Sequence, residues 1–218
     1  MKLNISSNDP WGNDFRSAPR LFAESWFEHG GVPPEVLERI DKYAKSQGIN
    51  LVLIGANAVN AYSGSPRFTQ DADLLSDNPE AITKFIEAEY PDLDWVELPV
   101  VNRFFKNKQE YIDVVKPDSN TMQDALNNTK QFESFTIPTL PMMVILKYAS
   151  FVSGHRSKQK KLQDEADLIG MIENPDFVFA AVKKLVRRCG EYDPQELFNK
   201  IIQIRLDARK HPRTDQTS

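Results

Sequence analysis

Residues 51–75 read LVLIGANAVNAYSGSPRFTQDADLL: a short apolar run, a glycine turn, a polar segment and a second apolar run that holds two carboxylates. Alternate residues of a β-strand face the same side, so Asp71 and Asp73 are expected to project together. Neighbouring carboxylates repel each other unless a cation lies between them, and magnesium prefers oxygen ligands of this kind. A helix that opens at Gly55 would offer free backbone N–H groups to an anion. The stretch therefore predicts a site for magnesium and a nucleoside triphosphate.

The same residues carry a family resemblance. The pattern G-A-x-A at residues 55–58, followed by R-x-T-x-D-x-D at residues 67–73, resembles the signature of the DNA polymerase β-like nucleotidyltransferase superfamily. Within it, the toxin-type (AbiEii-like) bacterial group is the most similar. The family has a third carboxylate on a later strand, and Asp113 in the run YIDVV (residues 111–115) matches it. The family also has Gly or Ser where this chain has Ala56, which keeps the backbone N–H but supplies no hydroxyl.

The resemblance implies a role for each matching residue. Asp71 and Asp73 would bind two magnesium ions, and Asp113 would complete the ligands of the catalytic one. The toxin-type group also has a catalytic lysine at the start of a later helix and an acid after it, which correspond to Lys147 and Asp164. The residues implied to bind the nucleotide are Gly55, Ala56, Asn57 and Arg67.

Each of these assignments has a structural alternative. The two carboxylates of residues 71–73 could be exposed strand-end acids, and the chain holds a second D-x-D pair at residues 92–94. Lys147 could lay its stem along an apolar helix and reach water. Asp164 could form a helix-surface ion pair with Lys160 or Lys161, and Arg67 could pair with a local acid.

The order of the sequence patterns predicts an α+β fold. Strands are expected at 51–54, 72–75, 94–98, 101–106, 110–115 and 132–137, with helices at 34–47, 56–63 and 79–89. After Pro138 the helical period continues through 142–152, 160–172, 177–188 and 194–209. We therefore expect a nucleotidyltransferase-type mixed sheet flanked by helices and followed by a C-terminal helical bundle. The expected divisions are an N-terminal arm at 1–33 with a short helix at 19–29, a catalytic domain at 34–137, a helical domain at 138–210 and a disordered tail at 211–218.

Composition restricts the class of protein. The 218 residues are 40% hydrophobic and 27% charged, which is ordinary for a soluble globular protein. The single Cys189 cannot form an internal disulfide, which fits a reducing compartment. Residues 1–20 lack the apolar core of a signal peptide, and no apolar run is long enough to span a bilayer. We expect a soluble cytoplasmic protein without a membrane partner.

The predicted function is that of a magnesium-dependent nucleotidyltransferase, which moves a nucleoside monophosphate from a triphosphate to a hydroxyl acceptor by two-metal phosphoryl transfer. One alternative is a catalytically weak or inactive relative that still binds a nucleotide. Others are a transferase that modifies an antibiotic or metabolite, and a helical interaction protein without a nucleotide site.

Charge is spread unevenly along the chain. The residues before Lys147 include 13 basic and 21 acidic side chains, whereas those from Lys147 onward include 14 basic and 10 acidic side chains. A basic C-terminal part can attract a polyanion such as tRNA, although clusters of this kind can also be no more than a solvated helical surface. Toxin-type relatives often act on tRNA and are encoded beside an antitoxin, so the resemblance implies both as partners.

Overall fold

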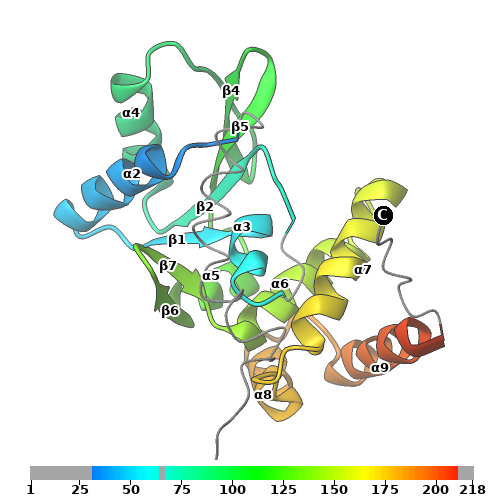
Figure 1. Cartoon of the computed structure of the whole chain (residues 1–218). Coiled ribbons are helices and arrows are strands. Elements are labelled where there is room, and N and C mark those ends of the chain that lie inside the picture. Colours follow the sequence, from blue (N-terminus) through cyan, green and yellow to red (C-terminus); the bar gives the residue numbers. More distant parts are fainter. Residues whose placement is uncertain (1–30, 64–66, 211–218) are drawn as a thin grey trace, which may run out of the picture.

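The computed structural model describes residues 31–63 and 67–210. Its centre is a five-stranded mixed sheet (Figure 1) in the order β1-β2-β5-β4-β3. The strands are β1 (Leu51–Ile54), β2 (Ala72–Ser76), β3 (Asp94–Glu97), β4 (Val101–Lys106) and β5 (Gln109–Val115). The central pair β2 and β5 is parallel, and the other pairs are antiparallel. The mixed sheet expected from the sequence is confirmed.

In the described residues, four helices and a hairpin complete the sheet half. Helix α2 (Pro34–Ser46) lies beside α4 (Pro79–Glu89), where the rings of Tyr43 and Phe85 stack with their centroids 4.1 Å apart. Both helices begin at a proline, whose fixed backbone angle suits the first helical turn. The short α3 (Gly55–Asn60) follows β1 directly, and α5 (Asn120–Asn127) follows β5. Strands β6 (Thr129–Phe132) and β7 (Phe135–Pro138) form a separate hairpin.

The C-terminal half is helical, as expected. It contains α6 (Leu140–Val152), α7 (Lys158–Ile172), α8 (Phe179–Cys189) and α9 (Pro194–Lys210). Residues 142–148 of α6 are all buried, because α7 and α8 cover this helix on the sides that the sheet half leaves free. Buried apolar residues of both halves form one continuous core. The domain boundary expected near residue 138 therefore stays a prediction, because the two halves share this core.

The sequence did not predict two elements. Helix α5 is rich in Asn and Gln, and it depends on the Ser119 side chain, which accepts a hydrogen bond from the Met122 backbone N–H. The β6–β7 hairpin was expected as one strand at 132–137. Its turn has no Gly or Asn, and Glu133 takes the positive φ of 51° instead. The helix expected at 19–29 and the tail at 211–218 lie outside the described residues.

Candidate active site

Two predicted metal ligands are direct neighbours in the sheet. Asp73 on β2 pairs with Asp113 on β5 in the parallel register, so both side chains leave the same face. Asp71 lies immediately before β2, two residues from Asp73, and its Oδ1 accepts a hydrogen bond from Thr69 Oγ1 at 2.5 Å. The fold therefore brings three carboxylates from one strand pair to one region.

The turn after β1 fits tightly against this region. Gly55 has a φ of +68°, and a Cβ atom at this position would lie 1.8 Å from Asp73 Oδ2. Both the backbone conformation and the lack of space require glycine. Gly55 is the first residue of α3, and no side chain caps the first backbone N–H groups of that helix. Carboxylate oxygens and helix N–H groups thus lie next to each other.

The charges of the three acids influence one another. Burial, followed by the charges of Asp71 and Asp113, raises the pKa of Asp73 to about 7. Lys147 and Arg156 act in the opposite direction but do not cancel the rise. A cation bound here would relieve the repulsion, because it favours the ionised form of each carboxyl group.

The next two residues of α3 are held by packing or by a hydrogen bond to a neighbouring segment. Ala56 is buried, and the side-chain amide of Asn57 donates to the backbone carbonyl of Asp71 at 3.1 Å. The buried Oδ1 of Asn57 has no hydrogen-bond partner among the described residues. Asn57 therefore fixes the backbone beside the carboxylate pair.

A residue that the sequence analysis missed holds the third carboxylate. Arg103 on β4 lies opposite the buried Asp113, and its Nε and Nη2 donate to the two carboxylate oxygens at 2.8 and 2.6 Å. Its Nη1 donates to Glu110. A charged residue inside an otherwise mostly apolar strand was the available signal for Arg103.

The register that brings Arg103 to Asp113 comes from an irregularity in the hairpin. Lys106 pairs with Gln109, and counting back regularly would set Arg103 against Ile112. A bulge leaves Tyr111 unpaired between Glu110 and Ile112, so every later partner moves by one residue. Nothing in the sequence of residues 101–115 marks this shift.

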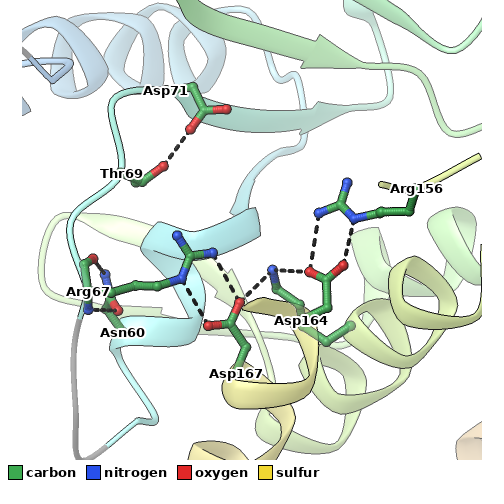
Figure 2. A network of polar contacts seen from close by, with 8 residues as sticks. Asn60, Arg67, Thr69, Asp71, Arg156, Asp164 and Asp167 are labelled. Carbon is green, nitrogen blue, oxygen red and sulfur yellow. Dashed lines mark hydrogen bonds and ion pairs between the residues drawn. The ribbon is translucent and has the colours of Figure 1, made fainter. Parts of the chain in front are cut away.

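A second group of charges joins the sheet half to the helical half (Figure 2). Asp167 of α7 accepts two hydrogen bonds from the Arg67 guanidinium at 3.0 and 3.2 Å. Asp164, one turn earlier, accepts two from Arg156 at 2.6 and 3.2 Å. Lys147 of α6 is buried between them, with its Nζ 2.8 Å from Asp167 and 3.2 Å from Asp164. The series Arg67–Asp167–Lys147–Asp164–Arg156 is called the charge chain below.

The charge chain differs from the structural alternatives that the sequence suggested for its residues, and the functional roles of these residues stay predictions. Lys147 does not reach water, because its side chain is only 6% exposed. Asp164 pairs with Lys147 and Arg156, not with Lys160 or Lys161. The acid that binds Arg67 is remote in sequence, not local. These corrections share a cause: α7 packs against α6 and α3, which sequence spacing cannot reveal.

The backbone of the Arg67 segment is fixed as well. Asn60, the last residue of α3, accepts from the Arg67 backbone N–H at 2.9 Å and donates to its carbonyl at 2.8 Å. In Asp167, burial would raise the pKa, but the hydrogen bonds and charges of Arg67 and Lys147 outweigh it, so the pKa lies below its usual range. The pair therefore stays ionised.

Among residues 31–63 and 67–210, no three His, Cys, Asp or Glu side chains are grouped closely enough to form a ready metal site. Two of the three predicted metal ligands are engaged by neighbouring side chains, Asp71 by Thr69 and Asp113 by Arg103. None of the helices in these ranges is long and apolar enough to cross a membrane.

The chain resembles solved structures of nucleotidyltransferase-like proteins. An antigenic nucleotidyltransferase-like protein from Paracoccidioides brasiliensis matches with a TM-score of 0.52 and 18% identity, over 81% of this chain and 89% of that one. The fold is that of a nucleotidyltransferase-like protein.

Lower-scoring matches include the Megavirus polyadenylate synthase, with a TM-score of 0.46 and 13% identity. That match covers 80% of this chain and 39% of the Megavirus chain, so this chain spans well under half of that protein. JHP933 from Helicobacter pylori has a TM-score of 0.46 and 16% identity, over 74% of this chain and 86% of that one. No family model matches the chain. No curated protein sequence matches it either.

Proposed function

We propose that this protein is a magnesium-dependent nucleotidyltransferase that moves a nucleoside monophosphate from a triphosphate to a hydroxyl group. One observation carries the proposal: Asp73 is the direct neighbour of Asp113, and its carboxylate occupies the space that a side chain at Gly55 would fill. Oxygen ligands and the start of a helix therefore meet at one point, as a metal–triphosphate complex requires. The nucleotidyltransferase-like fold supports the same class of reaction.

The donor set suits magnesium, because it consists of carboxylate oxygens without nitrogen or sulfur ligands. Asp71 and Asp73 would hold two ions, and Asp113 would complete the ligands of the catalytic one. Bound ions would neutralise charge on the phosphates and lower the pKa of the attacking hydroxyl. The raised pKa of Asp73 supports a cation site, since repulsion between the acids is then relieved by binding.

The other residues would bind and orient the substrates. The backbone N–H groups of Gly55, Ala56 and Asn57 would hold the β- and γ-phosphates at the uncapped start of α3. The acceptor oxygen attacks the α-phosphorus, the bond to the β-phosphate oxygen breaks, and pyrophosphate leaves. Asp113 would help to remove the proton of the attacking hydroxyl.

Lys147 and Arg67 would stabilise the charge that develops on the phosphates. Both side chains are held by Asp167, and Lys147 is also held by Asp164, so their positions are fixed before substrate arrives. Asp164 would act by orienting Lys147. The positive charge of Lys147 also acts on Asp73, where it offsets part of the rise in the pKa.

Transfer of label from each of the four α-³²P-labelled nucleoside triphosphates to total cellular RNA, protein and small molecules would test the proposal. We expect Asp73→Asn to reduce transfer roughly 100-fold or more, because a metal ion contributes several kcal/mol to the transition state. The chain offers a matched control in Asp92→Asn, which alters the second D-x-D pair, before the edge strand β3. Equal activity of wild type and Asp73→Asn with every nucleotide would refute the proposal that this protein is a nucleotidyltransferase.

A weakly active or inactive nucleotide-binding relative is the second candidate. The contact of Arg103 with Asp113 favours it, because the third ligand is engaged by a side chain. The discriminating measurement is the melting temperature with a triphosphate, in the presence and absence of magnesium. Stabilisation without any need for the metal would favour this binding module over the enzyme.

The acceptor and subgroup belong to the proposal as well. We take the toxin-type group as the subgroup, with tRNA or another RNA as acceptor and an antitoxin as a protein partner. Exposed basic residues support an RNA acceptor over an antibiotic or metabolite: Lys158, Lys160, Lys184 and Arg187. Two other basic residues of the C-terminal half already form ion pairs, Arg156 with Asp164 and Arg188 with Asp124.

A further inference from the structure

The contact between Arg103 and Asp113 is more than a cross-strand ion pair of the usual kind. The guanidinium uses two nitrogens on the two carboxylate oxygens of a buried side chain, and its third nitrogen donates to Glu110. Such paired, charge-assisted bonds are among the stronger hydrogen bonds in proteins. The Arg103 side chain is 25% exposed, so it has a path away from Asp113 toward solvent.

The guanidinium and a divalent cation would compete for the same atoms. Both oxygens of Asp113 are already hydrogen-bonded to Arg103, and the two positive charges would repel each other at this short range. Asp113 can therefore become a full metal ligand only if Arg103 moves back.

Glu110 provides a place for the displaced side chain. Glu110 lies opposite Phe105, just before the bulge at Tyr111, on the same hairpin and within reach of Arg103. Glu110 is partly exposed and is not one of the proposed metal ligands. Arg103 can keep this contact while it releases Asp113, so its charge remains paired throughout.

We propose that Arg103 is an internal counter-ion that occupies the Asp113 carboxylate until a divalent cation displaces it onto Glu110. The proposal rests on the metal site of the proposed function. In this role Arg103 is a positioning residue: without metal it offsets part of the repulsion between the three acids, and it lowers the affinity for the metal ion because it competes with that ion for Asp113.

Titration with Mn²⁺ as the probe, followed by the loss of the free-ion electron paramagnetic resonance signal, tests the proposal without any need for catalysis. Arg103→Gln should bind Mn²⁺ on the order of tenfold more tightly than wild type, because one competing positive charge is removed. Glu110→Gln should bind it more weakly, since Arg103 then has Asp113 as its only carboxylate partner. The double variant should resemble Arg103→Gln, because Glu110 acts only through Arg103.

Two controls separate this competition from general effects. Arg39→Gln removes an arginine of an exposed ion pair with Glu89 on the helices of the sheet half, and Mn²⁺ affinity should not change. Arg103→Lys keeps the charge but cannot form the paired contact, so its affinity should lie between wild type and Arg103→Gln. If Arg103→Gln does not fold, this lysine variant carries the test.

The possible outcomes separate the two ideas. Equal Mn²⁺ affinity in wild type, Arg103→Gln and Arg103→Lys, combined with loss of binding in Asp73→Asn, would overturn the role of Arg103 and leave the metal site intact. No binding in any variant would overturn both. Tighter binding in Arg103→Gln without nucleotidyl transfer by wild type would support the counter-ion and refute the proposed enzyme.

Discussion

At the scale of single residues, two glycines with the same backbone conformation allow a matched experiment. Gly48 and Gly55 have φ values of +67° and +68°, but only a Cβ at Gly55 would clash, whereas Gly48 has open space around it. Gly48→Ala should cost about 1 kcal/mol of stability from backbone strain alone. Gly55→Ala should cost more and should also weaken Mn²⁺ binding, because Asp73 must move. Urea unfolding measures the stability, and Mn²⁺ titration measures the metal affinity. If both variants lost the same stability and the same affinity, this would contradict the close fit of Gly55 and Asp73.

Asp73 gives the site a pH dependence. Its pKa is raised to about 7, so the metal-free folded chain holds this proton more tightly than the unfolded chain does. Asp73 therefore makes folding less favourable as pH rises from about 4 to about 7. Magnesium competes with the proton, so it should raise the melting temperature more at pH 8 than at pH 5.5. Asp73→Asn should remove the difference between the magnesium effects at the two pH values. An equal rise in the melting temperature of wild type at both pH values would contradict the role given to Asp73.

At the scale of elements, the charge chain links α6 and α7 through a buried lysine. Lys147→Met would leave Asp164 and Asp167 with one fewer cation in a buried place, and such losses cost about 3–5 kcal/mol. The double variant Lys147→Met/Asp167→Asn should recover part of that stability, since one of the two buried carboxylates that shared Lys147 is removed. Urea unfolding measures both, with the exposed Lys160→Met as the control. If Lys147→Met were as stable as the control, the charge chain would make no contribution to the stability of the fold.

The elements also show what sequence can predict here. The strand–glycine–helix unit and the two D-x-D carboxylates follow from local pattern, as does the helical period after residue 138. The hairpin β6–β7 and the pairing of Arg103 with Asp113 depend on a turn without glycine and on a bulge, which local pattern does not mark. The partners of Lys147 and Arg67 come from α7, and only packing between distant segments brings these charges together.

At the scale of the whole molecule, the exposed basic residues of the C-terminal half predict a salt-dependent interaction with RNA. Lys184 and Arg187 on α8 are exposed, whereas Arg188 is paired with Asp124 at 2.9 Å. Charge reversal at Lys184 and Arg187 should weaken tRNA binding for every sequence alike and reduce its salt dependence, because phosphates are contacted and bases are not. Filter binding at about 50 and 200 mM salt measures this, with Lys42→Glu on α2 as control. Binding that does not respond to salt would remove RNA as the acceptor.

The bulge at Tyr111 has a consequence for evolution and for protein engineering. Deletion of this one residue would remove the bulge and leave a regular hairpin in which Asp113 still lies opposite Arg103, because every pair from Phe104 onward already skips Tyr111. The variant would keep every acidic and basic side chain of the site, and Asp113 would still lie beside Asp73. A relative of the same length that forms a regular hairpin without the bulge would instead set Arg103 against Ile112 and turn Asp113 toward the opposite face of the sheet, so it would carry an intact motif without the geometry.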